Sequence, residues 1–287
     1  MNTKEMELRN RLKDKKRIVL KVGSSTITHT KTGDINLYIL EKLVRLISDL
    51  MGDGKEVVLV SSGAIAAGRK TLNYNERPDS ITVKQALAAV GQARLMMVYQ
   101  RLFAEYSHIA AQVLLTKNVV LNEESLVNVK NTFKELLELN AVPIVNENDT
   151  ISTAEISFSE NDRLAALVAG IIGADLVILL SDIDGLYTDD PSSNPDAKFI
   201  PFVPQVTEEF LKMGKQTSKS NVGTGGMRSK IDSARIAGDA GADMIIMNGS
   251  DVSKVMDVLD GKEIGTLFAA HKNPEFDLLH FIRHEYD

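Results

Sequence analysis

Apolar residues along the chain follow two patterns that alternate from one end to the other. Short continuous apolar runs, typical of buried parallel strands, predict strands over residues 17–22, 56–60, 108–115, 141–145, 176–180, 244–247 and 266–269. Between them, apolar residues at helical spacing predict helices over residues 40–51, 83–106, 133–139, 162–170, 206–213 and 252–259. This alternation predicts an α/β fold with an open, mostly parallel sheet covered by helices on both faces.

Polar segments rich in Gly, Ser, Asn and Asp follow several of the predicted strands. They span residues 23–25, 61–63, 146–149 and 181–184. In open parallel sheets, ligands bind at the carboxyl ends of the strands. The sequence therefore predicts a single ligand cleft at this edge. Residues 146–149 taken alone also have the composition of an ordinary turn.

Residues 223–230 read GTGGMRSK, and apolar residues at helical spacing follow from Met227. Glycines allow close approach of the backbone to a ligand, and the N–H groups that begin a helix favour an anion. Lys230 adds a positive charge, so the segment predicts a phosphate site. It matches neither the P-loop, which needs Gly-Lys-Ser/Thr, nor the dinucleotide fingerprint, which needs a glycine at Arg228. The alternative is a flexible surface linker with a solvated lysine.

Lys21 and Asp162 are ionisable residues in segments that the pattern predicts to be structured. Lys21 lies near the end of the first strand, and a buried lysine is costly unless it is paired. Lys21 and Lys230 suit opposite sides of a triphosphate, where cations stabilise the charge of the transferring group. Asp162 begins a helix, with Ser159 as N-cap, and suits a role in holding both lysines. The alternatives are a lysine that extends to the surface and a carboxylate that only serves the helix terminus.

Asp149 and Asn161 suit the ammonium or carboxylate group of a substrate. No Ser-His-Asp or Cys-His set is visible in the sequence. A substrate carboxylate is already ionised near neutral pH, so its reaction requires no general base.

The composition limits the class of protein. A chain of 287 residues with 44% hydrophobic and 25% charged residues is typical of a soluble globular protein. The net charge of −6 argues against a nucleic-acid-binding surface. With no cysteine and five scattered histidines, we predict no disulfide and no metal site built from protein ligands, and we expect a cytoplasmic location. We expect neither a signal peptide nor a membrane span.

Short motifs in a fixed order extend this interpretation. They are KVGSS at residues 21–25, SSGAIAAG at 61–68, AAVGQ at 88–92, PIVNEND at 143–149, SD at 181–182, DGLYT at 184–188, and GTGGM at 223–227 with Lys230. The ordered set resembles the glutamate 5-kinases of the amino acid kinase family from about residue 18 to residue 268.

The resemblance implies a three-layer αβα sandwich with an amino-acid lobe, residues 1–172, and a nucleotide lobe, residues 173–287. It implies ATP, Mg²⁺ and L-glutamate as reactants and γ-glutamyl phosphate and ADP as products, in the first step of proline biosynthesis. By motif position, the glutamate contacts are Ser62, Asp149 and Asn161. The phosphoryl-transfer cations are Lys21 and Lys230, organised by Asp162. The ATP contacts are Lys21, Ser181, Asp182, Thr224, Gly225, Gly226, Met227, Arg228, Ser229 and Lys230.

The resemblance also implies feedback inhibition by proline and handover of the product to glutamyl phosphate reductase. We expect a homo-oligomer and no nucleic-acid or membrane partner. Residues 159–162 read SEND where many members have Gly-Asp-Asn-Asp, so Glu160 is one methylene longer than the usual Asp. We also expect the chain to lack the small C-terminal PUA domain that many bacterial members carry.

Two alternatives stay open. Another family member, such as an acetylglutamate kinase, shares the chemistry, although residues 61–68 and 146–149 favour free glutamate. A non-catalytic sensor of amino acid and nucleotide is the second. Lys21, Asp162 and Lys230 together favour catalysis, because a sensor has no chemical need for all three.

Overall fold

The structure is a computed structural model that describes residues 3–29, 32–76, 78–152, 161–211, 226–279 and 281. The chain forms two compact units. We call Val22–Asn161 the inserted unit, and Met1–Lys21 together with Asp162–Asp287 the flanking unit. The predicted lobes, residues 1–172 and 173–287, were defined by the ligands that each is expected to bind. The assignment of these ligands to the lobes therefore stays a prediction.

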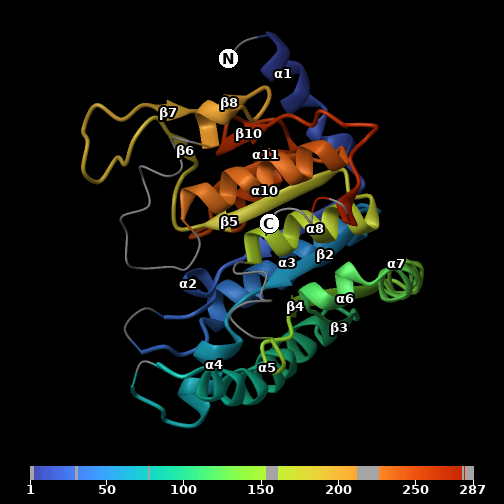
Figure 1. Cartoon of the computed structure of the whole chain (residues 1–287), viewed down its shortest axis with the longest axis vertical. Coiled ribbons are helices and arrows are strands. Elements are labelled where there is room, and N and C mark those ends of the chain that lie inside the picture. Colours follow the sequence, from blue (N-terminus) through green and yellow to red (C-terminus); the bar gives the residue numbers. More distant parts are fainter. Residues whose placement is uncertain are drawn as a thin grey trace. The chain divides into compact units, whose positions relative to one another are not determined.

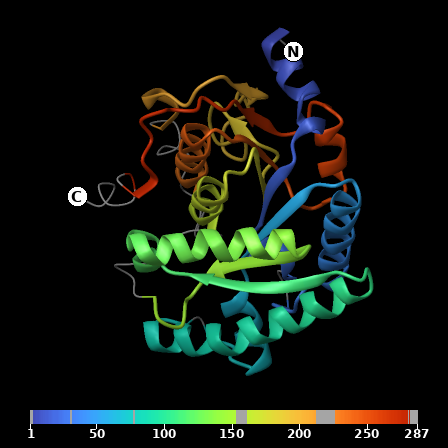
Figure 2. The same ribbon diagram turned by 90° about the vertical axis from the view of Figure 1, so that its right-hand side faces the viewer.

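The described residues of the inserted unit include three parallel strands between helices. Its strands follow the order β3-β4-β2, with bounds β2 (Glu56–Ser61), β3 (Ile109–Leu115) and β4 (Ala141–Glu147). The helices are α2 (Ser24–Ile27), α3 (Leu37–Gly52), α4 (Ala64–Thr71), α5 (Ile81–Ala104), α6 (Lys117–Leu121) and α7 (Glu123–Glu138). Helices α5 and α7 lie on opposite faces of β3 and β4 (Figure 2).

The strands of the flanking unit follow the order β1-β5-β9-β10-β8. Their bounds are β1 (Arg17–Val22), β5 (Leu176–Ser181), β9 (Asp243–Asn248), β10 (Thr266–Phe268) and β8 (Phe202–Val203). Strand β9 is parallel to β5 and antiparallel to β10. A separate antiparallel pair is formed by β6 (Leu186–Tyr187) and β7 (Phe199–Ile200).

The helices of the flanking unit lie on both faces of its strands. They are α1 (Thr3–Asn10), the 3₁₀ turn η1 (Leu12–Asp14), α8 (Asn161–Ile172), α10 (Met227–Ala240) and α11 (Lys254–Leu259). Helices α8 and α10 cover one face and α11 covers the other (Figure 2), and α10 lies along β5 (Figure 1). The predicted αβα layering and mostly parallel sheet are confirmed. In the described part of the chain, no helix combines the length and the apolar character that crossing a membrane requires.

The apolar runs produce this layering because they are buried on two sides. Every residue of β5 from Leu176 to Leu180 is fully buried. Helix α3 instead buries one stripe, which includes Leu40, Leu43 and Ile47, and it packs against β2 and α5. Its start is set by Asn36, whose Oδ1 accepts a hydrogen bond from the backbone N–H of Ile39 at 3.3 Å.

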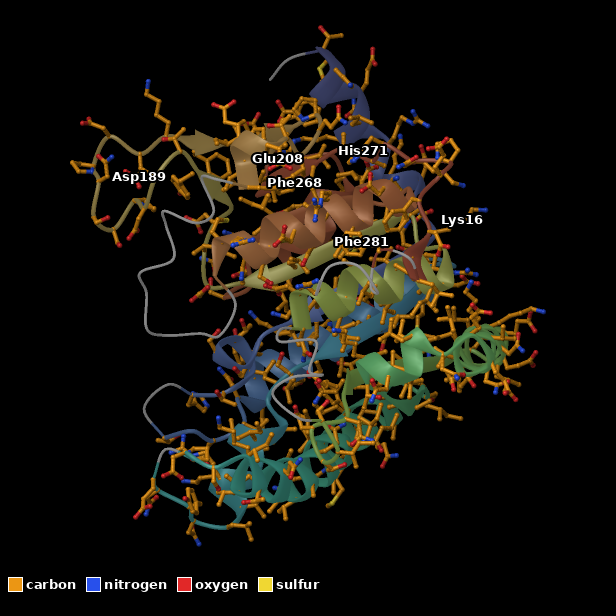
Figure 3. All side chains as sticks on the ribbon, viewed as in Figure 1. Lys16, Asp189, Glu208, Phe268, His271 and Phe281 are labelled. Atoms are coloured by element: carbon orange, nitrogen blue, oxygen red, sulfur yellow. The ribbon has the colours of Figure 1, made fainter. Side chains whose placement is uncertain are left out.

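Some elements differ from the prediction. Residues 183–205, for which the sequence predicted no helix or strand, contain β6, β7 and β8, which at two residues each are too short to produce an apolar run. The helix predicted over residues 133–139 begins ten residues earlier, at Glu123, because Asn122 caps it and its first turns are polar. Helix α4 was not predicted. Of the predicted helix over residues 206–213, residues 208–211 are helical, including Glu208 (Figure 3), and the last two lie outside the described residues.

Helices α4 and α5 cross with their backbones in contact at two glycines. A Cβ atom on Gly68 would lie 1.9 Å from the carbonyl oxygen of Leu87, and one on Gly91 would lie 1.7 Å from that of Ala64. No side chain fits at either position. The crossing therefore holds the start of α4, directly after Gly63, against the part of α5 that carries Gly91.

The chain after β10 packs against α10. The Nε2 atom of His271 lies 2.9 Å from Oδ1 of Asp239, and the guanidinium of Arg235 lies 5.5 Å from the ring centroid of Phe281. His271 and Phe281 are labelled in Figure 3. These contacts hold the helix whose first turn carries Lys230.

Candidate functional site

Three charged side chains of the flanking unit form a buried ion-pair set. Lys21 Nζ lies 2.6 Å from Asp162 Oδ1, and Lys230 Nζ lies 2.9 Å from Asp162 Oδ2. Lys21 is 9% exposed, Lys230 6% and Asp162 2%. Each carboxylate oxygen therefore holds one ammonium group. The surface-lysine alternatives for Lys21 and Lys230 are wrong, because both lysines are buried and paired.

The two lysines decide the charge state of Asp162. Burial by itself raises the pKa of this carboxyl, but the charges and hydrogen bonds of Lys21 and Lys230 outweigh burial and hold the pKa below its ordinary value. Asp162 is thus an anion at neutral pH. The set carries two positive charges and one negative charge, which suits an anionic ligand such as a phosphate chain.

Each member of this set is placed by its secondary structure. Lys21 is the next-to-last residue of β1, Asp162 lies in the first turn of α8, and Lys230 lies in the first turn of α10. Gly226 is the N-cap of α10, and a glycine has no side chain with which to cap the helix. The N–H groups that begin a helix favour an anion. The predicted helix from Met227 is confirmed, and the linker alternative is wrong for residues 226–230.

The other predicted residues near the start of α10 differ in their surroundings. Arg228 is exposed, with its Nε 3.8 Å from Asp232 Oδ2. The buried Oγ of Ser229 has no hydrogen-bond partner among the described residues. Met227 is half-buried. Thr224 and Gly225 lie outside the described residues, as do Ser159 and Glu160.

Polar side chains meet where β5 and β9 end. Ser181 Oγ donates to Asp182 Oδ1 at 3.1 Å. Asn248 is paired with Ser181 in the β5–β9 register, and its Nδ2 donates to Asp184 Oδ1 at 2.8 Å. The predicted residues Ser181 and Asp182 thus lie in a polar cluster at the carboxyl ends of two parallel strands.

The inserted unit carries a chain of neutral polar side chains. Asn161 Nδ2 donates to Ser62 Oγ and to Asn146 Oδ1, each at 2.8 Å. Asn146 Nδ2 in turn donates to Gln92 Oε1 at 3.1 Å. Asn146 and Gln92 are buried, and within the part of the chain that the structure describes the Nε2 of Gln92 has no hydrogen-bond partner. The structure therefore brings the predicted residues Ser62 and Asn161 together through their side chains.

Asp149 lies just beyond β4 in the same unit. Burial, with a smaller effect from the charge of Glu147, raises its pKa to about 6. Glu147 is buried and accepts a hydrogen bond from Ser152 Oγ at 2.6 Å. A half-buried carboxylate beside a second one is costly without a cation. A positively charged group such as an ammonium beside Asp149 would offset this cost.

Three residues in these clusters were not predicted as site residues. Asn146 and Gln92 lie within recognised motifs, but a neutral amide in a turn-like or helical context carries no signal of its own. Asn248 directly follows the apolar residues of β9, as Ser181 follows those of β5. That parallel placement of a polar residue after a buried strand was the available signal.

The carboxylates of the described residues are poorly placed to hold a divalent metal by themselves. No group of three or more His, Cys, Asp or Glu side chains in the described residues could hold a metal ion. Both oxygens of Asp162 already contact lysines. Mg²⁺ usually keeps several waters and binds substrate phosphates with few carboxylates. This chain therefore fits Mg²⁺ that arrives with a nucleotide better than a resident metal.

Comparisons with known proteins agree with the geometry. The model of the amino acid kinase family matches residues 16–248. A protein named glutamate 5-kinase from Clostridium perfringens is 49% identical over 92% of this chain and 99% of its own length. One from Carboxydothermus hydrogenoformans is 47% identical over 94% of this chain and 72% of its own length.

Solved structures resemble the fold at low sequence identity. The carbamate kinase of Giardia lamblia bound to AMP-PNP gives a TM-score of 0.62 at 15% identity, over 90% of this chain and 99% of its own. The isopentenyl phosphate kinase of T. acidophilum gives 0.60 at 18% identity, over 88% and 99%. These structures bear on the fold alone. The family model and the relatives named glutamate 5-kinase establish that this chain belongs to the amino acid kinase family.

Proposed function

We propose that this protein transfers the γ-phosphoryl group of ATP to the γ-carboxylate of L-glutamate, giving γ-glutamyl phosphate and ADP. The observation that carries the proposal is the buried set of Lys21, Asp162 and Lys230, in which one carboxylate holds two ammonium groups. Two fixed cations suit a phosphoryl group whose oxygens share negative charge during transfer. The relatives named glutamate 5-kinase support the choice of acceptor.

The proposed phosphoryl transfer needs no general base. An oxygen of the ionised γ-carboxylate attacks the γ-phosphorus, and the bond between this phosphorus and the bridging oxygen of ADP breaks. The electron pair of that bond leaves with ADP. Because the carboxylate is deprotonated near neutral pH, no proton has to be removed. Lys21 and Lys230 stabilise the transferring group, and Asp162 keeps both ammonium groups in place.

The amino acid is assigned to the neutral chain of the inserted unit. Ser62 and Asn161 offer hydrogen-bonding groups to carboxylate oxygens, and the donation from Asn161 Nδ2 to Ser62 Oγ fixes their spacing. Asp149 pairs with the α-ammonium group, whose charge compensates the burial cost of this carboxylate.

The nucleotide is assigned to the flanking unit. Ser181, Asp182 and residues 224–230 are proposed as its contacts, together with Lys21. The start of α10 offers N–H groups to the phosphates. Mg²⁺ bound to the phosphates would neutralise part of their charge.

A coupled assay of ADP release tests this function against the two alternatives. We expect release that depends on L-glutamate. Stimulation by N-acetylglutamate but not by glutamate would indicate an acetylglutamate kinase. Binding of both ligands without ADP release would indicate a sensor.

We further propose a cytoplasmic role in the first step of proline biosynthesis, in a homo-oligomer. An acyl phosphate hydrolyses readily, so its direct use by glutamyl phosphate reductase would limit its loss. Light scattering of the purified chain tests the homo-oligomer, and a monomer would contradict it. Faster conversion with the reductase present than in sequential incubations tests the handover.

A further inference from the structure

The ends of β5 and β9 are joined by the main chain and by one side chain. Ser181 and Asn248 are opposite each other in the β5–β9 register. The backbone N–H of Gly249 donates to the carbonyl of Ser181 at 2.7 Å. Asn248 therefore lies beside the residue at which the chain leaves β5 and enters the segment proposed to contact the nucleotide.

The side chain of Asn248 is held in one orientation. Its Oδ1 accepts a hydrogen bond from the backbone N–H of Ser250 at 2.9 Å. A backbone N–H can only donate, so the amide oxygen must face Ser250 and the amide nitrogen must face away from it. That nitrogen, Nδ2, donates to Asp184 Oδ1 at 2.8 Å.

Asp184 ends a short segment that is anchored beyond it as well. Gly185 has a φ of 156°, and a Cβ at this position would lie 2.6 Å from Thr266 Oγ1. The next residue, Leu186, donates its backbone N–H to the same hydroxyl oxygen at 2.8 Å. Residues 182–184 thus follow directly from β5 and precede Leu186, which is bonded to Thr266. The bond from Asn248 to Asp184 holds the segment between these two anchors.

We propose that Asn248 is a positioning residue for the nucleotide, because its bond to Asp184 fixes the segment that presents Ser181 and Asp182. This inference rests on the proposed function. An ionised Asp182 can only accept hydrogen bonds, and it repels phosphates. Its suitable partners are the donors of the nucleoside, namely ribose hydroxyls or the adenine amino group. Asn248 therefore acts on nucleoside binding and not on phosphoryl transfer.

The test compares Asn248→Ala with a matched control, Asn273→Ala. Asn273 also accepts a hydrogen bond through Oδ1 from the N–H two residues later, that of Glu275 at 3.0 Å. The control removes this local turn bond in the same unit. We expect Asn248→Ala to raise KM for ATP about 3- to 10-fold, as for the loss of one ordinary hydrogen bond. We expect kcat and KM for glutamate to change less than about 2-fold, and Asn273→Ala to behave as wild type.

An exchange of the two partners separates the bond from general structure. Asn248→Asp alone places two carboxylates together and should raise KM for ATP at least as much as Asn248→Ala. The double variant Asn248→Asp/Asp184→Asn puts the amide donor on the opposite side and should restore KM to within about 2-fold of wild type. Thermal unfolding of each variant checks that it is folded.

Direct binding of ADP, measured by calorimetry, keeps this inference separate from the proposed function. We expect the dissociation constants of ADP and of ATP to rise by the same factor in Asn248→Ala. If wild-type protein binds ADP but shows no glutamate-dependent turnover, the proposed function is contradicted. The effect of Asn248→Ala on ADP binding can still be measured in that case. Unchanged ADP binding in Asn248→Ala, or an equal rise of KM for both substrates, would overturn the role of Asn248.

Discussion

The candidate site of the flanking unit is built from charged side chains, and that of the inserted unit is built mainly from neutral ones. In the flanking unit, Asp162 lies between the ammonium groups of Lys21 and Lys230. In the inserted unit, Asn161 links Ser62 to other neutral side chains by hydrogen bonds without ionised groups. Both arrangements are largely buried, yet one relies on charge and the other on directional bonds.

The difference indicates a division of labour. Charges that are fixed before the reaction stabilise charge that develops during transfer, so they act on kcat. Neutral amides define where an amino acid lies, so they act on its KM. Asp149 is the exception in the inserted unit, because it needs a cation to offset the cost of its burial.

Lys230→Ala should reduce kcat by about 10²-fold or more, because it removes one preorganised cation from the transferring group. KM for ATP should change far less. Lys254→Ala is the control, since this lysine is exposed at the start of α11 in the same unit. Steady-state kinetics of both variants test the prediction. Near-normal turnover in Lys230→Ala would contradict a role of the charged set in phosphoryl transfer.

Gly91→Ala should disturb the neutral chain while leaving the charged set intact. The added Cβ would meet the carbonyl of Ala64 at 1.7 Å, and forcing α4 and α5 apart should cost about 1–3 kcal/mol of stability. Gln92 is the next residue, so KM for glutamate should rise as well. Gly52→Ala is the control, because its Cβ would meet nothing within 4 Å. Chemical denaturation of both variants measures the difference, and equal stabilities would contradict the tight crossing.

Asp149→Asn should raise KM for glutamate about tenfold, as for the loss of one charged contact worth about 1.4 kcal/mol, with little change in KM for ATP. In the wild type, KM for glutamate measured as a function of pH should reveal the same contribution of the Asp149 carboxylate. Because the pKa of Asp149 is about 6, the carboxylate gains a proton as pH falls through 6, and KM for glutamate should rise there. A larger effect on ATP than on glutamate would reverse the assignment of the two units.

The same variant should be more stable than wild type at pH 7.5. A carboxyl whose pKa is raised on folding contributes stability below its unfolded pKa of about 3.8, and this is lost as pH rises through about 6. Removing the carboxylate should therefore raise Tm at pH 7.5 and leave it unchanged near pH 4. A lower Tm at pH 7.5 would mean that a partner already compensates Asp149 in the free protein.

Proline should inhibit competitively against glutamate, with the smallest effect of this series. It keeps an α-carboxylate and a cationic nitrogen, so it can use the contacts at Ser62, Asp149 and Asn161. It offers no γ-carboxylate to phosphorylate, and its rigid ring lowers the entropy cost of binding. Initial rates at several fixed proline concentrations decide the mode. A fall in kcat at saturating glutamate, with KM unchanged, would indicate a separate site.

The sequence predicted most of the fold because buried strands leave long apolar runs. The run in β5 and the stripe on α3 needed no tertiary information. Helix α4 was missed because it has only eight residues and contains Gly68, which is unfavourable in a helix. The structure shows that Gly68 is needed for the close contact with α5. The two-residue strands β6–β8 exist only through pairing, which a local pattern does not contain.

The charged part of the site was predicted more completely than the neutral part. Lys21, Asp162 and Lys230 stand out because ionisable residues are rarely placed where burial is expected. Asn146 and Asn248 do not stand out, because an amide at a strand end also suits a turn, and Gln92 does not stand out because a neutral amide is ordinary within a helix such as α5. Their roles depend on partners between 15 and 64 residues away along the chain, which only the structure supplies.

The central claim is that the chain forms an acyl phosphate on the γ-carboxylate of glutamate. Incubation with ATP, Mg²⁺, L-glutamate and hydroxylamine tests it most directly, because hydroxylamine converts an acyl phosphate to a hydroxamate. The account predicts γ-glutamyl hydroxamate in equal amount to ADP, absent without ATP and strongly reduced in Lys230→Ala. Glutamate-dependent ADP release with no γ-glutamyl hydroxamate would contradict it.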